Sequence, residues 1–565
     1  MSIHRTRYSL IASVLIILTL AAGCALPWGK PTPVPATATA PPPAATAVEP
    51  VAVEPTPAPA KPAEVPARAD PTKPPADTSS ESGSTPEPEP EGAHPASSLF
   101  DVQWDDRSIF RQGLISAEQQ VLDLLPGATV YHIDVEVADD FFALRGHEQV
   151  LYTNREEEPL QQVYFRLFPN MAGGKVTPSA VKINGQDAQS ALEYQDSALR
   201  VDLPVPLPPG EQVVIEMDFD VEVAREMAGN YGLFGYFEGV LVLDEFYPTI
   251  PVYDDEGWNV EVPPPSGDVT YYDASFYIVR VTAPTDLTIV GSGIEVDRRQ
   301  EGDRLVLTLA AGPARDFYFA GSEKFTSVSQ VVGETVVNSY AFKERTDGAT
   351  VALQSATAAL ESFNERYGVY PYTEFDLLST PMQALGVEYP GATAISIDLY
   401  NPNAEVLGLP AHVILESTVA HEVAHQWFYN VVGNDQVDEP WVDEALAQYL
   451  TGIYYLDAYG DQAASSYRQS WTDRWERVER ADIPIGLPVA AYEGREYGAI
   501  VYGRGPLFVR ALAMKMGQED FAVFLRDYYQ SHKWGIGTAA AFREVADRHS
   551  DRDLTELFEQ WVYEQ

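Results

Sequence analysis

Two histidines and a glutamate in the second half of the chain have the spacing of a catalytic metal site. The sequence reads HEVAH at residues 421–425. Positions i and i+4 share one face of a helix, so the imidazoles of His421 and His425 can converge on one point. Zinc accepts neutral imidazole nitrogens, and a catalytic zinc needs one more protein ligand and one open position. Glu422 can reach a water at that position without displacing a ligand, so the motif predicts a zinc site with Glu422 as general base.

A third ligand is expected downstream, on a second helix. Apolar residues flank residues 421–425 at helical spacing, and residues 441–449 (WVDEALAQY) read as the start of another amphipathic helix. Two helices joined by the polar loop between them can pack antiparallel and bring Glu444 to the metal. Asp443 has two interpretations: it orients a ligand imidazole, or it is a capping or solvated residue at the helix start.

These motifs resemble those of the gluzincin metallopeptidases, and among them the aminopeptidase N family. The resemblance covers roughly residues 125–565, and the motifs follow the family's order. Besides HEVAHQW and WVDEALAQY, the chain has GVEYPG, similar to the family's GxMEN segment, YGRG, similar to its YxKG segment, and the lead-in YGVYPY. The resemblance implies a thermolysin-like catalytic domain that hydrolyses peptide bonds.

The resemblance also implies a role for each site residue. One zinc ion per chain would be held by His421, His425 and Glu444. Glu422 would take a proton from the attacking water and pass it to the leaving amine. The phenol of Tyr502, in the YGRG segment, would stabilise the oxyanion beside the zinc.

Substrate binding is expected at the GVEYPG segment. The resemblance places Glu388 on the free α-amino group of a peptide, with Gly386 in the same substrate-binding segment. A carboxylate there would fix the chain end and make the enzyme an aminopeptidase. However, Leu385, Val387 and Tyr389 stand where the family has Gly, Met and Asn.

Other functions stay open at this point. A zinc endopeptidase and an epoxide-hydrolysing relative share the same zinc site. A non-catalytic, peptide-binding surface lipoprotein would keep the fold, although all three ligands and Glu422 are present. Larger members of the family continue into further domains over the site, so the resemblance implies a more open cleft for this chain.

Length and charge limit the possible partners. A chain of 565 residues is too long for one core and should contain two or more domains. Its net charge of −46 argues against nucleic acid, whose phosphates need Lys and Arg, and disfavours direct adsorption to an anionic membrane. The partner that the resemblance implies is a peptide substrate.

The N-terminus indicates export and a lipid anchor. A basic start precedes a short apolar run at residues 10–22, and LAAGC follows at residues 20–24. Cys24 is the only cysteine, so it cannot form an internal disulfide. The segment resembles a bacterial lipobox, which implies a signal peptide at 1–23, acylation of Cys24, and a membrane-anchored, extracytoplasmic lipoprotein at the cell surface or in the periplasm. The alternative is an uncleaved anchor.

Composition divides the remainder into three parts. Residues 24–100 are rich in Pro and Ala and have few large apolar residues, which predicts a disordered tether. Residues 101–342 are predicted to form an all-β domain with a short leading helix at 110–125. Period-two runs at 131–137 and 213–221, and an Asn184-Gly185 turn signal, support the strands.

Residues 343–565 are predicted to form the catalytic domain. Its period is mainly helical, with a short strand at 375–378 and a candidate edge strand at 386–396 that borders the cleft. The helices expected besides the two zinc helices are at 349–367, 506–516, 519–532, 539–549 and 554–563. The fold class is therefore multidomain, an all-β domain followed by a thermolysin-like α/β, mainly helical catalytic domain.

Overall fold

The computed structural model describes residues 99–227, 231–264 and 266–563. The predicted signal peptide, Cys24 and nearly all of the predicted tether lie outside these residues. Within the described part of the chain, no helix combines the length and apolarity needed to cross a membrane.

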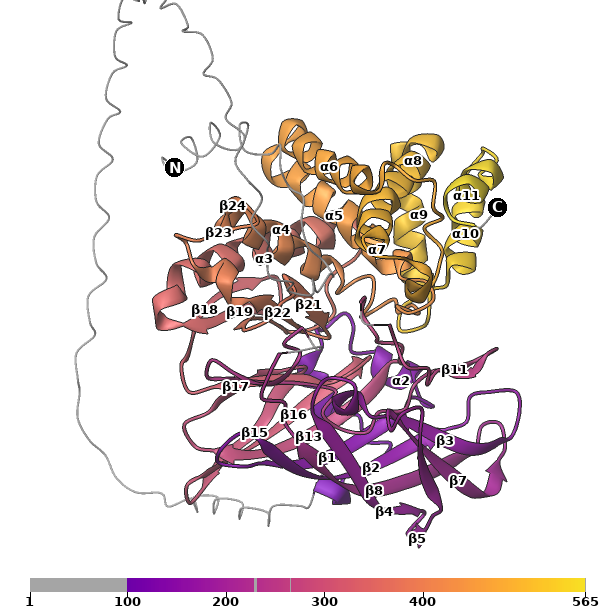
Figure 1. Ribbon diagram of the computed structural model, residues 1–565. Helices are drawn as coiled ribbons and strands as arrows, with labels where there is room; N and C mark the ends of the chain where they lie inside the picture. Colours follow the sequence, from indigo (N-terminus) through magenta and orange to yellow (C-terminus); the bar gives the residue numbers. More distant parts are fainter. Residues whose placement is uncertain (1–98, 228–230, 265, 564–565) are drawn as a thin grey trace, which may run out of the picture. The chain divides into compact units, whose positions relative to one another are not determined.

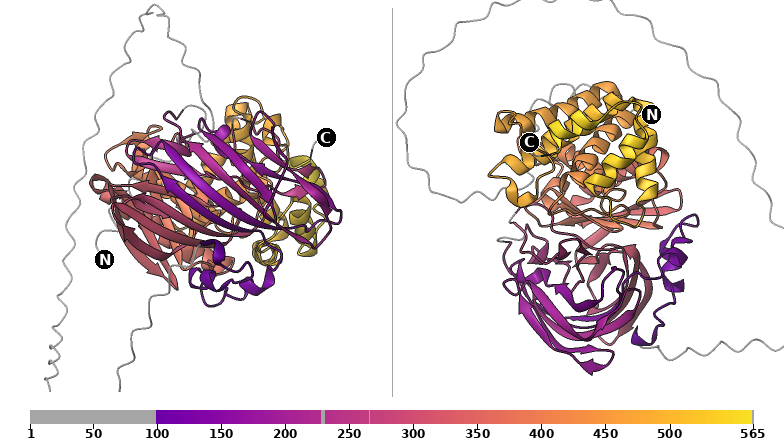
Figure 2. Two further views of the ribbon diagram at one scale, coloured as in Figure 1. Left: turned by 90° about the horizontal axis from the view of Figure 1, so that it is seen from below. Right: turned by 90° about the vertical axis from the view of Figure 1, so that its right-hand side faces the viewer.

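The first region is built on a twisted eight-stranded sheet with the order β15-β16-β13-β1-β2-β8-β4-β5 (Figure 1). Strands β1 and β13 pair in parallel and the other neighbours are antiparallel. The strands are β1 (Val130–Val137), β2 (Ala143–Thr153), β4 (Lys175–Ile183), β5 (Gln186–Asp187), β8 (Gln212–Glu222), β13 (Ser275–Pro284), β15 (Ile294–Glu301) and β16 (Arg304–Ala314). The left view of Figure 2 shows these long strands.

Smaller sheets share the core of this sheet. One has the order β3-β7-β6 and another the order β14-β17-β10-β9. Their strands are β3 (Leu160–Arg166), β6 (Ser190–Glu193), β7 (Ala198–Leu207), β9 (Phe234–Phe237), β10 (Val240–Asp244), β14 (Thr288–Gly291) and β17 (Tyr318–Ser322). A two-stranded hairpin, β11 (Tyr253–Asp254) and β12 (Gly257–Trp258), completes the region. Alternate residues of β8 are buried, as period two predicts.

The predicted Asn-Gly turn is present between β4 and β5. Asn184 and Gly185 both have positive φ, 49° and 76°, the combination that a tight hairpin turn with the strand's own twist requires. In contrast, the predicted helix at 110–125 is wrong. The segment forms the 3₁₀ turn η2 (Ser108–Gly113) and one turn of helix, α2 (Val121–Leu124), because Ile115 N donates to the Pro371 carbonyl (2.9 Å) and Leu114 bridges to Tyr372.

The second region begins one hairpin earlier than the sequence suggests. Its sheet has the order β18-β19-β20-β22-β21. The strands are β18 (Phe325–Val332), β19 (Thr335–Phe342), β20 (Glu374–Thr380), β21 (Gly386–Tyr389) and β22 (Ala392–Ser396). Strand β18 pairs with β19, and β19 pairs in parallel with β20. These two strands, placed in the all-β domain by the predicted boundary at 342, therefore belong to the sheet of the catalytic region, as Figure 1 shows.

The predicted edge strand at 386–396 is a hairpin. Strand β21 lies at the edge of the sheet and pairs antiparallel with β22, with Gly391 (φ 76°) in the turn. This geometry places one face of β21 against the helices that carry the site, since α4 packs on both strands of the hairpin.

Helices gather on one side of this sheet, as the right view of Figure 2 shows. They are α3 (Thr346–Arg366), α4 (Ala411–Ala424), α5 (Trp441–Tyr459), α6 (Asp461–Trp475), α7 (Glu496–Ala499), the π-helix η8 (Ile500–Arg504), α8 (Gly505–Met516), α9 (Gln518–Ser531), α10 (Ala539–Arg548) and α11 (Thr555–Trp561). Further 3₁₀ turns are η1 (Leu99–Asp101), η3 (Phe168–Asn170), η4 (Lys343–Arg345), η5 (Ile397–Tyr400), η6 (Glu476–Val478) and η7 (Val489–Ala491). A short hairpin, β23 (Glu405–Val406) and β24 (Leu409–Pro410), precedes α4.

The two helices of the predicted zinc site are buried on all sides around the site residues, whereas the sequence predicts amphipathic helices with one exposed face. Every residue of α4 from Ser417 to Ala424 is buried, and so is every residue of α5 from Trp441 to Gly452. The apolar spacing around the HExxH motif was correct for a helix. The predicted exposed face is absent from these stretches because the sheet, α3 and the later helices cover α4 and α5 from several sides.

A buried arginine of the first region stabilises the loop that follows α4. Arg315, 2% exposed, donates from Nε to the carbonyls of Tyr429 and Asn430 (3.0 Å each) and from Nη2 to that of Val431 (3.2 Å). It also donates to the carbonyl of Gly535 (2.5 Å). One side chain therefore satisfies backbone acceptors of two loops in the catalytic region.

Candidate active site

The structure brings the three predicted ligands together. His421 is in the last turn of α4, His425 follows at its C-cap, and Glu444 is in the first turn of α5. His421 Nε2 lies 3.1 Å from Glu444 Oε2 and 3.2 Å from His425 Nε2. His425 Nε2 lies 3.6 Å from Glu444 Oε2. All three side chains are buried.

This geometry fits a bound cation. The Nε2 atoms of His421 and His425 and a carboxylate oxygen of Glu444 point at one small volume. In neutral imidazoles whose Nε2 atoms carry lone pairs, neither nitrogen has a hydrogen-bond donor there, whereas a cation would satisfy both. His425 Nδ1 donates to the Phe428 carbonyl (3.2 Å), which leaves the lone pair of its Nε2 directed at the other donors. Although burial raises the pKa of Glu444, its contacts with the two imidazoles hold that pKa well below its usual range. Two histidines and a glutamate are the donor set of a catalytic zinc, and the described site fits one such ion.

Glu422 has the position expected for a base. It is 4% exposed, and its Oε2 has no hydrogen-bond partner among the described residues. Burial, followed by repulsion from Glu388, raises the pKa of Glu422 well above its usual value. Gly386 of β21 lies directly against this carboxylate, since a Cβ at Gly386 would lie 2.7 Å from Cδ of Glu422. Gly386 therefore leaves room for Glu422, a contact that the sequence did not indicate.

Tyr502 comes to the site on an irregular turn of helix. It lies in the π-helix η8, and its hydroxyl donates to Glu444 Oε1. Gly505 allows this turn to pack closely on α5, because a Cβ there would lie 2.8 Å from Cβ of Ala445. Single π turns are frequent at functional sites, and here one aims the phenol at the ligand cluster. Burial, then the charge of Glu444, raises the pKa of Tyr502 well above its usual value, so the hydroxyl stays protonated.

Glu388 lies on β21 with its carboxylate in the same cavity. It is 6% exposed, and its Oε1 accepts a hydrogen bond from Gln436 Nε2 (2.8 Å). The same Nε2 donates to Asp443 Oδ2 (2.9 Å), and Gln436 Oε1 accepts from Thr270 N (3.2 Å). Burial raises the pKa of Glu388. Gln436, which the sequence did not single out, thus connects the strand of Glu388, the helix of Glu444 and a loop of the first region.

Asp443 follows neither sequence interpretation fully. It is 1% exposed and therefore not solvated. It lies inside α5, where its Oδ1 accepts from the backbone N–H of Glu444 (2.8 Å) without capping the helix, and its Oδ2 accepts from Gln436. The nearby Glu439, just before α5, accepts from Ala539 N (2.8 Å) at the start of α10.

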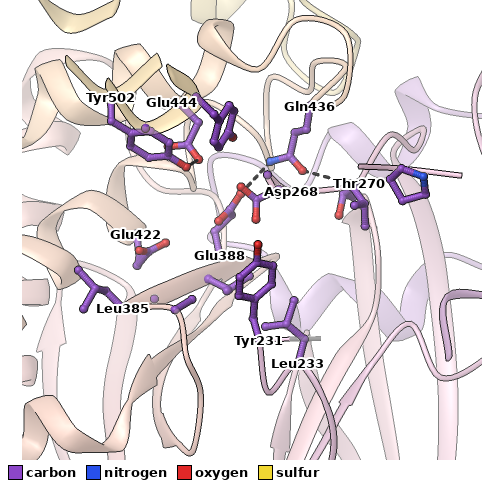
Figure 3. A pocket seen from close by; sticks show the side chains of 18 of the residues that line it. Tyr231, Leu233, Asp268, Thr270, Leu385, Glu388, Glu422, Gln436, Glu444 and Tyr502 are labelled. Carbon is purple, nitrogen blue, oxygen red and sulfur yellow. Dashed lines mark hydrogen bonds between the residues drawn. The ribbon is translucent and has the colours of Figure 1, made fainter. Parts of the chain in front are cut away.

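A second carboxylate enters the site from the first region. Asp268 belongs to the loop between β12 and β13, and in Figure 3 its carboxylate lies beside that of Glu388, below the amide of Gln436. Burial, followed by repulsion from Glu388 and Glu444, raises its pKa well above its usual value. Neither period nor motif marks this proline-rich loop in the sequence, so Asp268 could not have been found there.

These groups share one cavity between the two regions, with a volume of about 470 Å³. Volumes of this size are typical of small-molecule sites. Five acids line it: Asp244, Asp268, Glu388, Glu422 and Glu444. Figure 3 shows Glu422, Glu388 and Tyr502 turned toward the same space.

An HExxH helix, a third donor from the next long helix and the glutamate of the motif beside them have the arrangement of a gluzincin-type zinc site. In comparison with known families, residues 351–561 match the peptidase family M1 domain. The predicted cofactor, one zinc ion, fits the donor set of the site and the match to the M1 domain.

Similar proteins are named as aminopeptidases. The chain is 24% identical to probable aminopeptidase 2 of Sulfurisphaera tokodaii over 50% of its own length and 37% of that protein. It is 24% identical to human endoplasmic reticulum aminopeptidase 1 over 37% of its own length and 23% of that protein. The chain thus spans less than half the length of these relatives.

Solved structures share the two-region fold. A variant of an M1 zinc metallopeptidase from Deinococcus radiodurans aligns with a TM-score of 0.60 at 19% identity, covering 78% of this chain and 95% of that one. A structure of a two-domain M1 zinc metallopeptidase variant bound to L-arginine aligns with a TM-score of 0.59 at 18% identity, covering 78% of this chain and 94% of that one. The predicted fold class, a β-rich region followed by a mainly helical catalytic region, is confirmed.

Proposed function

We propose that this protein is a zinc aminopeptidase that removes residues from the free N-terminus of peptides. The observation that carries the proposal is the buried carboxylate of Glu388, which shares the cavity with the ligand cluster and is joined there by Asp268. An ammonium ion needs a nearby anion to offset its desolvation, and a charged hydrogen bond in a buried site is stronger than an exposed one. A substrate amine held at Glu388 would place the first peptide bond over the zinc site. The names of the similar proteins support the same activity.

The chain's own groups supply the proton transfers. When bound, a zinc ion supplies the Lewis acidity that activates water and polarises a carbonyl. Glu422 takes the proton of the attacking water and delivers it to the nitrogen of the leaving amine as the C–N bond breaks. The hydroxyl of Tyr502, which rests on Glu444 in the structure, donates to the oxygen on which negative charge develops.

The test compares peptides that differ only at the N-terminus. The zinc-loaded full-length protein should cleave Ala-Ala-Ala with a kcat/KM at least 100-fold above that for N-acetyl-Ala-Ala-Ala. At about 1.4 kcal/mol per tenfold change, this ratio corresponds to about 2.8 kcal/mol in activation free energy. Glu388→Gln should raise KM for the free peptide and reduce the difference in kcat/KM between the free and the acetylated peptide. The substitution removes the negative charge of the side chain and keeps its shape. Equal cleavage of the two peptides by the wild type would instead identify an endopeptidase.

We also propose that the enzyme is a lipoprotein anchored outside the cytoplasm through Cys24. The support is the basic start, the apolar run and the LAAGC segment of the sequence, all outside the described residues. Metabolic labelling with a fatty acid should mark the wild type, and Cys24→Ser should lose the label. Persistence of the label in Cys24→Ser would exclude this cysteine as the acylated residue.

A further inference from the structure

A basic patch interrupts the acidic wall of the cavity. Among the described residues that line the cavity, Arg474 and Arg477 are the only ones with a guanidinium or ammonium group. Arg474 is near the end of α6, and Arg477 is in the following 3₁₀ turn η6. They are two cations in a cavity that five acids also line.

Arg474 is fixed to the elements that carry the catalytic residues. Its Nη1 donates to Gln448 Oε1 (3.0 Å) on α5, one helical turn after Glu444. The same Nη1 donates to the carbonyl of Tyr502 (3.3 Å). Tyr467 also donates to Gln448 Oε1 (2.8 Å), which orients the amide. A guanidinium has five N–H donors, and these two contacts leave others for a ligand.

Arg477 lacks a partner where it is buried. Its Nη2 is shielded from solvent and has no hydrogen-bond partner in the part of the chain that the structure describes. Burial, followed by repulsion from Arg474 and Arg495, lowers the pKa of Arg477 to about 10. A buried donor without an acceptor is costly, and two adjacent cations repel each other, so an anion between them would relieve both.

We propose that Arg474 and Arg477 bind a carboxylate of the substrate, so that the enzyme prefers peptides with a negative charge close to the scissile bond. The proposal rests on the proposed aminopeptidase function and names the class of peptide that it takes. Carboxylates match the planar fork of a guanidinium and pair with it through two parallel hydrogen bonds. The cavity then has an acidic side for the ammonium group and a basic side for the carboxylate.

The carboxylate has two sources that chemistry alone does not separate. One is the C-terminus of a peptide short enough for both of its ends to lie in the cavity. The other is an acidic side chain at the first or second residue of a longer peptide. In both cases Arg477 contributes mainly to binding, so its loss should act on KM.

Three substrate pairs distinguish these sources in the zinc-loaded full-length protein. Ala-Ala-Ala against its C-terminal amide reports the chain end. Glu-4-nitroanilide compared with Gln-4-nitroanilide tests a carboxylate on the side chain of the first residue. Ala-Glu-Ala-amide compared with Ala-Gln-Ala-amide tests a carboxylate on the side chain of the second residue. In at least one pair the charged member should have a kcat/KM about tenfold higher or more, the size of one charge-assisted hydrogen bond. Arg477→Met should remove that preference through KM and leave the neutral member unchanged.

Arg480→Met is the matched control, because it removes an exposed guanidinium of the same segment that pairs with Glu476. It should keep the wild-type preference. Ala-4-nitroanilide, which carries no carboxylate, reports whether Arg477→Met is folded and whether the aminopeptidase itself works. No preference in any pair, or an unchanged preference in Arg477→Met, would overturn the proposal while leaving cleavage of Ala-4-nitroanilide intact.

A binding measurement keeps the proposal testable if the protein proves inactive. Zinc-loaded Glu422→Gln protein should bind Ala-Ala-Ala, or the charged member of another pair, at least about tenfold more tightly than its neutral counterpart by calorimetry. The double variant with Arg477→Met should lose the difference. Equal dissociation constants for all three pairs would contradict the carboxylate site independently of catalysis.

Discussion

Gly386→Ala should inactivate the enzyme by displacing Glu422. The added Cβ would lie 2.7 Å from Cδ and 2.8 Å from Cγ of Glu422, and closer still to Oε1. Carbon atoms in contact are normally about 3.5–4.0 Å apart, so the glutamate must move by about 1 Å. The backbone of Gly386 in β21 does not have positive φ, so alanine brings no backbone strain and the effect is one of space alone.

The magnitude follows from the role of Glu422. A positioned general base contributes roughly 10²–10⁴-fold, and a misplacement of about 1 Å can cost about 10². We therefore expect kcat to fall at least 100-fold, about 2.7 kcal/mol in the activation free energy. Zinc content should stay at the wild-type value, because the three atoms nearest the added methyl group all belong to Glu422, which is not one of the three ligands.

Steady-state kinetics on Ala-Ala-Ala and metal analysis test this, with a double-mutant cycle as control. In the Glu422→Gln background, Gly386→Ala should cost almost nothing, because the group it acts on is already disabled. Additive losses, or wild-type kcat in Gly386→Ala, would refute the reasoning that Gly386 acts through Glu422.

Three further variants test other parts of the structure. Tyr502→Phe removes the donor to Glu444 and should lower kcat about 100-fold, with zinc content and KM near wild type, as kinetics and metal analysis would show. Arg315→Met leaves backbone carbonyls of two loops without a donor and should lower the free energy of unfolding by about 3 kcal/mol or more in urea titrations. Burial, then the nearby charge of Arg107, lowers the pKa of His132 from 6.5 to about 4. The unfolded chain takes up this proton first, so the stability due to neutral His132 is complete above pH 6.5 and falls by about 3 kcal/mol as pH drops to about 4. His132→Gln should flatten that part of the pH profile of unfolding.

Local sequence patterns were enough to predict the three residues of the ligand cluster. His421 and His425 are one helical turn apart, and Glu444 begins the next long helix, so a short-range rule brought the three together. Period two found the strands of the first region, and the Asn-Gly pair found its turn. Glu388 and Tyr502 were found by resemblance to a family rather than by any local rule.

The residues that sequence reasoning missed depend on contacts between distant segments. Asp268 and Gln436 meet at Glu388 from a loop and a helix-joining segment without a periodic pattern. No motif or spacing in the sequence distinguishes Arg474 and Arg477 from other charged residues, and only the fold places them in the lining of the cavity. The amphipathic interpretation of α4 and α5 failed for a related reason: the later helices bury the faces that local pattern treated as exposed.

Zinc titration of activity tests the central claim most directly. A chelator first removes the metal and is then separated from the protein. The metal-free full-length chain should not cleave Ala-Ala-Ala. Added zinc should restore activity linearly and reach a plateau at one equivalent per chain, because His421, His425 and Glu444 form one donor set. His421→Ala should give no such restoration at the same zinc concentrations. Full activity in the metal-free protein, or no activity at any zinc concentration, would contradict the account.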